Sequence, residues 1–391
     1  MSCFDRTLER MQCNDPTLKC VSLSYQELTE SQIKLFLEAL KNNKTIQTLW
    51  MCGYNNENWV NLLSDILKIG ITIRKLKLCD NDLLNYPKVM KFLSEILKTN
   101  KTLRKLDLGE NNFGNNPEGM KLLSKALKTN NTLQELNLEL NDLGNCPKGL
   151  GYLSEALKIN NTLQVLHLYN NNLGNCPEGM SYISKALEYN TTLQKLSLND
   201  NKLGNCLEGM KCLSESLKIN NTLRELDLHR NDLGNCPEEM FFLSNAIKIN
   251  TSIQLLDLGT NNLGNCPEGV KFLSNAIKIN TSIQLLDLES NNLGNCPEGM
   301  VFLSEALKIN KTLRILYLDV NNFQNSFNEM DYFLEALKSN RSIQILGIAF
   351  NSVNETVLSE IKHVVERNKH NAFHRDHCLF ELLLTVTPDF E

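Results

Sequence analysis

Four residues near the C-terminus are of the types that ligate transition metals: His370, His374, His377 and Cys378. Imidazole nitrogens and a thiolate suit zinc or a similar ion when they converge on one point. Their spacing matches no familiar metal motif, and neighbours in sequence need not converge in space. We therefore expect no metal here, and expect the apolar run 379–384 to cover the end of a hydrophobic core.

Cysteine can also bind metals or form disulfides, and six cysteines recur at thirty-residue intervals: Cys146, Cys176, Cys206, Cys236, Cys266 and Cys296. A metal site needs ligands gathered around one ion, whereas equivalent positions of a repeat supply a straight row. Small thiols pack well in protein cores. We expect these cysteines to be reduced and buried, with neither metal nor disulfides, and predict no cofactor for the chain.

The cysteine interval is part of a repeat that runs from Ile73 to Ile343. Each unit carries the pattern LxxLxLxxNxL, as in the run from Leu133 through Asn141 to Leu143. Units of this length indicate a solenoid, in which each repeat buries its apolar side against its neighbours. The unit starts predict twelve strands; they fall at 18, 46, 73, 103, 133, 163, 193, 223, 253, 283, 313 and 343.

Within each repeat, apolar residues first recur every second position, as in a strand, and then every three or four positions, as in a helix. Leu136 and Leu138 are two residues apart, so they share the inner side of a strand, while the residues between them point outward. Asn141 and its equivalents are placed to bond backbone groups where the chain leaves the strand. After a turn, Pro177 begins a helix whose Met180, Ile183 and Leu187 face the strands, and Asn190 ends it. The first repeat carries a capping box from Thr29 to Gln32.

This pattern resembles the leucine-rich repeat proteins of the ribonuclease-inhibitor-like type, which alternate a strand carrying LxxLxLxxN with a full helix. The resemblance implies an α/β horseshoe with parallel strands on the concave face and helices on the convex face. We assign 1–17 to an N-terminal segment, 18–353 to the repeats, and 354–391 to a C-terminal capping helix, expected over 354–368, and a tail. N-x-S/T sequons at Asn130, Asn160 and Asn310 coincide with helix ends, so we interpret them as structural.

Proteins of this kind bind partners through the concave face, so the outward residues of the strands and of the turns after them are the candidate contacts. Aspartates at 227, 257 and 287 should lie on adjacent strands, where like charges repel and a cationic ligand would relieve the repulsion. Aromatic side chains anchor interfaces. The predicted partner-binding residues are Trp50, Lys77, Glu110, Glu139, His167, Tyr169, Asp200, Asp227, His229, Arg230, Asp257, Asp287, Glu289, Tyr317 and Asp319.

The composition limits the kinds of partner. The formal net charge is −5 and the sequence pI is about 5.8. These values argue against nucleic acid and favour a protein partner with a basic surface. The N-terminal residues lack the apolar core of a signal peptide, and no apolar run is long enough to span a membrane. We expect a soluble, monomeric, cytoplasmic protein.

The leading functional hypothesis is a noncatalytic interaction scaffold, because no nucleophile elbow, phosphate loop or zinc motif is present. Some members of the resembled family accelerate GTP hydrolysis by a small GTPase, which makes a GTPase-activating protein the alternative. An exposed arginine would then stabilise the transferring phosphoryl group, and Arg230 is the candidate. The near-identical repeats, rich in Asn, Lys and Ile, also resemble effectors that intracellular bacteria deliver into the host cytoplasm.

Overall fold

The computed structural model describes residues 3–53, 58–69, 72–83, 87–323 and 327–385, with side chains described as far as residue 372 except at 3, 58, 60, 67, 87 and 327. It contains one open sheet of parallel strands in chain order, alternating with helices, which confirms the predicted α/β leucine-rich repeat solenoid. The chain divides into two compact units. Unit 1 comprises residues 1–202 and 215–223, and unit 2 comprises residues 203–214 and 224–391.

The twelve strands of the described residues are each three residues long and begin two residues after the predicted repeat starts. Those of unit 1 are β1 (Cys20–Ser22), β2 (Thr48–Trp50), β3 (Lys75–Lys77), β4 (Lys105–Asp107), β5 (Glu135–Asn137), β6 (Val165–His167) and β7 (Lys195–Ser197). Those of unit 2 are β8 (Glu225–Asp227), β9 (Leu255–Asp257), β10 (Leu285–Asp287), β11 (Ile315–Tyr317) and β12 (Ile345–Gly347).

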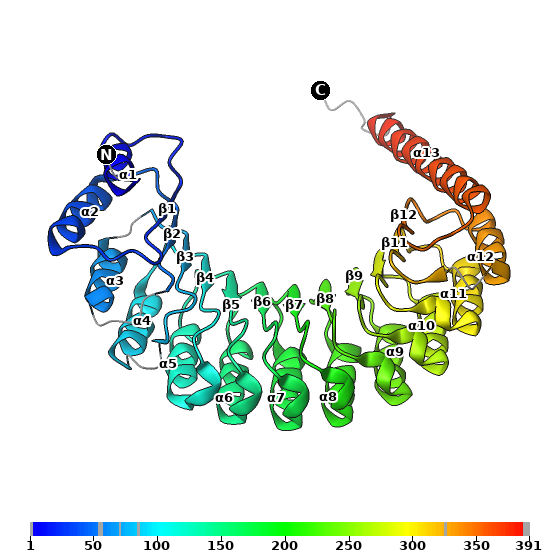
Figure 1. Cartoon of the computed structure of the whole chain (residues 1–391), viewed down its shortest axis with the longest axis horizontal. Coiled ribbons are helices and arrows are strands. Elements are labelled where there is room, and N and C mark those ends of the chain that lie inside the picture. The colour runs from blue at the N-terminus through cyan, green and yellow to red at the C-terminus, as the bar shows by residue number, and fades with distance from the viewer. Residues whose placement is uncertain (1–2, 54–57, 70–71, 84–86, 324–326, 386–391) are drawn as a thin grey trace. The chain divides into compact units, whose positions relative to one another are not determined.

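Each strand leads through a turn to a helix. Unit 1 contains α1 (Cys3–Gln12), α2 (Glu30–Asn42), α3 (Asn58–Ile69), α4 (Pro87–Thr99), α5 (Pro117–Leu127), α6 (Pro147–Leu157) and α7 (Pro177–Tyr189). Unit 2 contains α9 (Pro237–Ile249), α10 (Pro267–Ile279), α11 (Pro297–Ile309), α12 (Phe327–Ser339) and α13 (Glu355–Thr385), and residues of α8 (Leu207–Ile219) belong to both units. Within each unit the strands form the concave layer and the helices the convex layer (Figure 1).

The hydrophobic core lies between these two layers. In the repeat of β5, Leu136 and Leu138 are fully buried, and in the next repeat Met180, Ile183 and Leu187 of α7 are buried, as predicted. Pro177 occupies the first turn of that helix and Asn190 caps its end. Thr29 and Gln32 form the expected capping box at the start of α2. These local features position each strand so that its first and third residues point out of the core.

A ladder of buried asparagines joins consecutive repeats. Asn141 Nδ2 donates to the carbonyl of Leu108 in the preceding repeat at 2.9 Å, and its Oδ1 accepts from the amide of Asn111 at 2.9 Å. Eight members of the ladder have no exposed surface: Asn111, Asn141, Asn171, Asn201, Asn231, Asn261, Asn291 and Asn321. The amides satisfy backbone groups that the short strands leave without partners, as the sequence predicted.

A second column of buried asparagines ends the helices. Asn160 Nδ2 donates to the carbonyl of Leu127 at 2.7 Å, while its Oδ1 accepts from the amides of Thr162 and Leu163. Asn130 and Asn310 make equivalent bonds. The structural interpretation of the sequons is therefore confirmed.

The cysteine column follows the prediction at five positions and departs from it at one. All six thiols are free, and Cys146, Cys176, Cys206, Cys266 and Cys296 are buried. Cys236 is only half-buried, which corrects the expectation. The glycine that lies three residues further on in neighbouring repeats, such as Gly269, is replaced here by Glu239. A side chain at Gly269 would meet the Cys266 sulfur at 3.0 Å, so the larger residue leaves less room for the thiol beneath it.

Two further cysteines form a disulfide that the sequence analysis did not anticipate. Cys52 follows β2 and Cys79 follows β3, with 4.9 Å between their Cα atoms. They are 27 residues apart, the spacing of equivalent positions in these two repeats. That spacing was the available clue, because equivalent residues of adjacent parallel strands lie about 5 Å apart.

The C-terminal helix is longer than expected. We predicted a helix over 354–368 followed by a tail, whereas α13 continues to Thr385. Its Ile361 and Val364 are buried, as predicted, but Val357 is partly exposed. His370 is exposed, while the side chains of His374, His377, Cys378 and the apolar run 379–384 lie outside the described residues. Among the described helices, none combines the length and apolar character needed to cross a membrane.

We predict that replacing Asn141 by alanine lowers the free energy of unfolding by about 1–3 kcal/mol, because buried backbone groups of three segments lose their partner. Chemical denaturation followed by circular dichroism measures the change. Replacing the exposed Asn161 by alanine is the control and should change stability by less than about 0.5 kcal/mol. Equal effects of the two substitutions would contradict the role assigned to the ladder.

We predict that a thiol reagent labels the exposed Cys13 and Cys20 rapidly in the native protein and labels the five buried column cysteines only after unfolding. Cys236 should react at an intermediate rate, because it is partly exposed while its hydrogen bond to Glu238 raises the pKa of its thiol to about 11. Mass spectrometry of timed samples resolves the sites. Rapid native labelling of the whole column would refute the burial assignment.

Candidate functional site

The strand layer of unit 2 carries an acidic row formed by the third residues of β8, β9 and β10. Asp227 pairs in register with Asp257, and Asp257 with Asp287. In each aspartate, Oδ1 accepts a hydrogen bond from the backbone amide two residues further on, at 2.8–3.1 Å. The side chains are therefore held in position by their own turns while they remain partly exposed.

Electrostatics of the acidic row differ along its length. Burial raises the pKa of Asp287 to about 6, and the nearby Asp257 and Glu289 carboxylates add to the rise, while a backbone hydrogen bond opposes it. His229 Nδ1 lies 3.7 Å from Asp257 Oδ1, and this contact raises the pKa of His229 against the effect of burial. The row thus holds a dense negative charge that one histidine partly offsets.

An aliphatic column lies beside the acidic row and was missed by the sequence analysis. The first residues of β9 to β12 are Leu255, Leu285, Ile315 and Ile345, which pair in register. They point to the same side of the sheet as the third residues, because strand side chains alternate. Ile345 is 42% exposed and the other three are partly exposed. The clue in the sequence was the change at the first strand position from charged residues in β3 to β5 to leucine or isoleucine in β9 to β12.

The remaining predicted residues of unit 2 lie around these two columns. Tyr317 of β11 pairs in register with Asp287 at the end of the acidic row. Asp319 accepts a hydrogen bond from the amide of Ala349 at 2.7 Å. Glu289 is exposed beyond β10. Arg230 is exposed in a turn with a φ of 54°, so it lies past the end of β8 and not on the strand itself.

The strand layer of unit 1 has a different character, because its charges are paired. Lys77 Nζ lies 4.9 Å from the centre of the Trp50 ring and 3.6 Å from Asp107 Oδ2. Lys105 forms an ion pair with Glu135, and His167 Nε2 lies 3.9 Å from Glu135 Oε1. Burial lowers the pKa of His167 in spite of Glu135. A shallow hollow of about 270 Å³ on this surface is thus lined by both signs of charge.

The other predicted residues of unit 1 divide between strand ends and turns. Glu139 and Tyr169 lie two residues beyond β5 and β6 and are partly exposed. Glu110 and Asp200 occupy left-handed turns, with φ of 55° and 54°. The structure therefore distributes the predicted site residues over two units. It brings the acidic residues of unit 2 together, while in unit 1 Lys77 and His167 lie beside acidic groups.

Two groups outside the strand layer have chemistry that the prediction omitted. Cys236, Glu238 and Glu239 bring a thiol and two carboxylates within 4.8 Å of one another, a set of donors suited to a divalent cation. Glu239 is only 3% exposed, and Glu238 accepts the hydrogen bond of the Cys236 thiol at 2.8 Å. The departure of Glu239 from the repeated glycine was the clue in the sequence.

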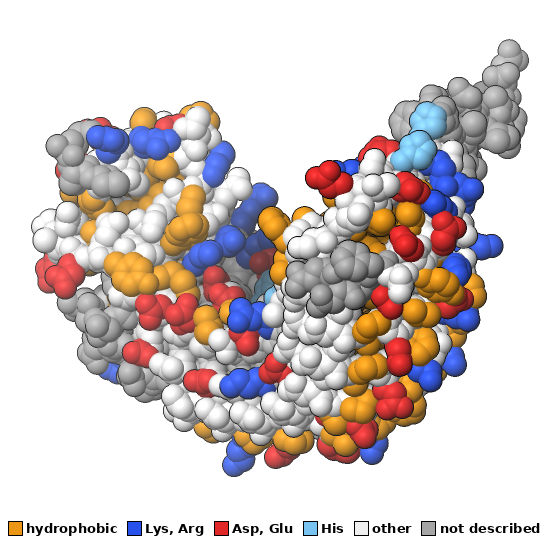
Figure 2. Space-filling model, turned by 45° about the vertical axis from the view of Figure 1, so that its right-hand side comes forward, with side chains coloured by type: hydrophobic (Ala, Val, Ile, Leu, Met, Phe, Trp, Pro, Cys, Tyr) orange, Lys and Arg blue, Asp and Glu red, His pale blue; other side chains and the backbone are white. Residues whose placement is uncertain are grey.

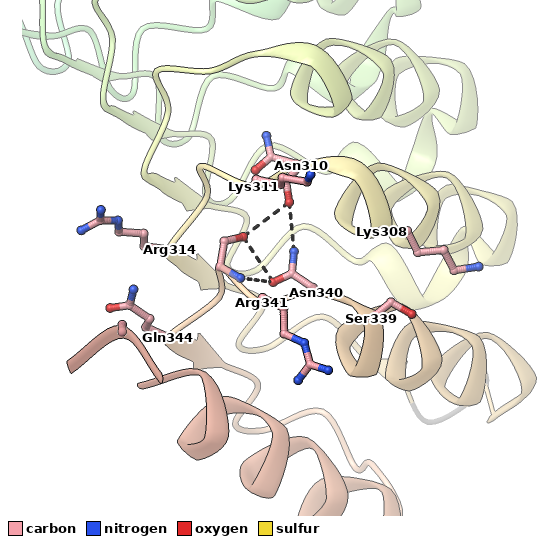
Figure 3. Close-up of a pocket in the computed structure, with 10 residues that line it drawn as sticks. Lys308, Asn310, Lys311, Arg314, Ser339, Asn340, Arg341 and Gln344 are labelled. Carbon is pink, nitrogen blue, oxygen red and sulfur yellow. Dashed lines mark hydrogen bonds between the residues drawn. The ribbon is translucent and has the colours of Figure 1, made fainter. Parts of the chain in front are cut away.

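The second group is a pocket at the C-terminal ends of α11 and α12 in unit 2, lined by Lys308, Lys311, Arg314 and Arg341 (Figure 3). Basic and acidic side chains are interspersed over the helices of this unit (Figure 2), so a cationic lining is a local feature. The clue in the sequence was again a departure from the repeat, since the two preceding repeats carry threonine, Thr251 and Thr281, at the position of Lys311 and Arg341.

We predict that replacing Asp287 by asparagine stabilises the fold increasingly as pH rises from about 4 to about 7. The raised pKa means that the native state holds this proton more tightly than the unfolded chain. Its stabilising contribution is therefore complete below about pH 4 and is lost as pH rises through about 6. With allowance for solvent screening of this partly exposed group, we expect a gain of about 1 kcal/mol at neutral pH. Denaturation at both pH values measures it, and a gain that is independent of pH would contradict the assignment.

Comparison with known proteins supports the repeat assignment. The family profile described as leucine rich repeat matches residues 99–124, 129–145, 189–214 and 220–235. A search of curated proteins found no significant match. Among solved structures, the tropomodulin C-terminal domain of Caenorhabditis elegans is similar with 18% identity and a TM-score of 0.35, covering 44% of this chain and 97% of that one.

Another similar structure is titled leiomodin-1 actin-binding site 2, with 22% identity and a TM-score of 0.23, covering 56% of this chain and 91% of that one. Likenesses of this strength carry no argument about partners. The matched profile, the twelve regular strands and the asparagine ladder agree with one another. The chain therefore contains leucine-rich repeats folded as an α/β solenoid.

Proposed function

We propose that this protein is a noncatalytic interaction scaffold that binds a basic segment of a partner protein on the strand layer of unit 2. The observation that carries the proposal is the acidic row beside the aliphatic column. The two lie two residues apart on the same side of β9 and β10. A partner segment with one apolar side and adjacent lysine or arginine residues complements both columns at once.

The geometry favours an amphipathic helix as the bound segment. Adjacent strands are about 4.8 Å apart, so a column that crosses the sheet has nearly the repeat of a helical turn, about 5.4 Å. A helix lying across β9 to β12 would therefore present one apolar side chain to each strand. Its flanking basic residues would face the acidic row. Tyr317 lies at the end of that row, where an aromatic side chain can anchor the segment.

The same proposal covers the wider predicted surface and the setting of the protein. Trp50, Lys77, Glu110, Glu139, His167, Tyr169 and Asp200 of unit 1, with His229, Arg230, Glu289 and Asp319 of unit 2, would provide additional contacts. We propose a monomer of the ribonuclease-inhibitor-like type that acts in the cytoplasm without nucleic acid, cofactor or membrane insertion. Its near-identical repeats support a role as an effector in a host cytoplasm.

The alternative of a GTPase-activating protein finds little support. Its candidate arginine, Arg230, follows a strand that ends in Asp227, and Asp257 lies on the adjacent strand. Negative charge at this place repels the phosphate groups that such an arginine must approach. The acidic row favours a cationic ligand instead.

We predict that a synthetic helical peptide, with leucines at i, i+3 and i+7 spacing flanked by lysines, binds the full chain. The triple variant D227N, D257N, D287N should weaken binding about tenfold, equivalent to about 1.4 kcal/mol, mainly through slower association. Asparagine is the suitable replacement because Asn137 occupies this column in β5, where its Oδ1 accepts the same backbone hydrogen bond at 2.9 Å. Stopped-flow fluorescence of a labelled peptide measures both rates.

Two controls make this test specific. A scrambled peptide of identical composition should bind at least tenfold more weakly, because it lacks an apolar side. Circular dichroism should show the triple variant fully folded. If wild type and variant bind the ordered peptide equally, the proposal is wrong, and the exposed isoleucines on the helices of unit 2, Ile249, Ile279 and Ile309, become the next candidate surface.

A further inference from the structure

The pocket at the ends of α11 and α12 has a volume of about 320 Å³ and a cationic rim. Lys311 and Arg341 are in the turns that follow these helices, Arg314 directly precedes β11, and all three are exposed. Figure 3 shows the Arg314 and Arg341 side chains extending in different directions from a floor that contains Asn310 and Asn340. Described lining residues include no aspartate or glutamate.

The lining cations divide into one that is paired and three that are not. Lys308 Nζ lies 2.9 Å from Glu305 Oε1 and 4.0 Å from the centre of the Tyr332 ring. Within the described part of the chain, the side chains of Lys311, Arg314 and Arg341 make no hydrogen bond or ion pair. Three positive groups thus surround a hollow without a counter-charge from the protein.

Equivalent positions of other repeats show that this arrangement is local. Seven repeats earlier, Lys101 Nζ donates to Asn131 Oδ1 at 3.1 Å and Arg104 donates to the carbonyl of Thr132 at 3.0 Å. Arg224 makes the same kind of bond to Ser252. At the pocket, Arg341 occupies the position of Asn131. Lys311 therefore has a second cation where Lys101 has a neutral hydrogen-bond acceptor.

Structural demands of the repeat do not account for Lys311 and Arg341. Positive side chains often stabilise the C-terminal end of a helix, and Lys308 and Lys338 in the last turns of α11 and α12 are placed to do so. The position that follows the helix end is occupied by Thr251 and Thr281 in the preceding repeats, so the fold requires no charge there. Burial and, to a lesser extent, the positive charge of Arg341 lower the pKa of the Arg367 guanidinium in α13, so a further cation lies close to Arg341.

We propose that this pocket binds an anion that carries two phosphate groups, with Arg314, Arg341 and Lys311 as its ligands. Each guanidinium can donate two parallel hydrogen bonds to phosphate oxygens, and the lysine supplies a point charge. Two phosphate groups carry a charge of about −3 to −4 at neutral pH, which matches three unpaired cations, whereas one carboxylate would neutralise only one of them. The ligand can be a small diphosphate or a doubly phosphorylated segment of a partner.

Isothermal titration calorimetry of the full chain at constant ionic strength tests the proposal, with pyrophosphate, orthophosphate and a doubly phosphorylated peptide as probes. We expect pyrophosphate to bind at least tenfold more tightly than orthophosphate. The variant K311T, R314Q should lose at least tenfold in pyrophosphate affinity. Both replacements are the residues found in preceding repeats, Thr281 and Gln284, so the fold should be preserved.

The matched control is the double variant K101T, R104Q. It removes the same two charges from equivalent positions seven repeats away and should change the pyrophosphate affinity less than twofold. Equal losses in the two double variants would reduce the effect to net charge and overturn the proposal. Binding of an unphosphorylated glutamate peptide as tight as that of the phosphorylated one would also overturn it. Peptide binding tighter than pyrophosphate binding would assign the site to a phosphorylated partner, and the reverse to a small diphosphate.

Discussion

The fold depends on one interaction, the hydrogen bonding of backbone groups by a buried asparagine from the next repeat. A three-residue strand pairs few of its own amides and carbonyls, and the turn that follows it lies inside the solenoid. Asn141 and its equivalents supply both a donor and an acceptor there. Since an unpaired buried polar group is costly, each repeat is stable only in one register with its neighbours.

This fixed register turns the repeat into a set of straight columns. Side chains at equivalent positions lie on adjacent strands, so a small number of substitutions produces a continuous surface. In unit 1 the columns carry both signs of charge, and several charges pair across strands, as between Lys77 and Asp107. In unit 2 like residues follow one another, so the aspartates of β8 to β10 repel each other.

Departures from the repeat are informative because the repeat itself provides the reference state. Glu239 stands where neighbouring repeats have glycine, and its carboxylate is buried beside Cys236. Arg341 stands where Thr281 and Asn131 occur, and it faces no acid in the described pocket lining. Both changes place a charged group where other repeats have a neutral residue.

The sequence was sufficient to predict the fold class, the number and position of the strands, and the identity of the core. Leucines alternate along each strand and the whole pattern recurs every thirty residues, so only one arrangement of the repeats buries them all. The roles of Asn141, Pro177 and Thr29 were predictable too, since each depends on contacts near in sequence or repeated in every unit. The tertiary structure decided which residues gather across repeats. It paired Lys105 with Glu135, aligned Leu255 with Leu285, displaced Cys236 from the core, and collected Lys311, Arg314 and Arg341 around one hollow. Such contacts depend on side-chain direction and on neighbours thirty residues away, which a reading along one strand does not contain.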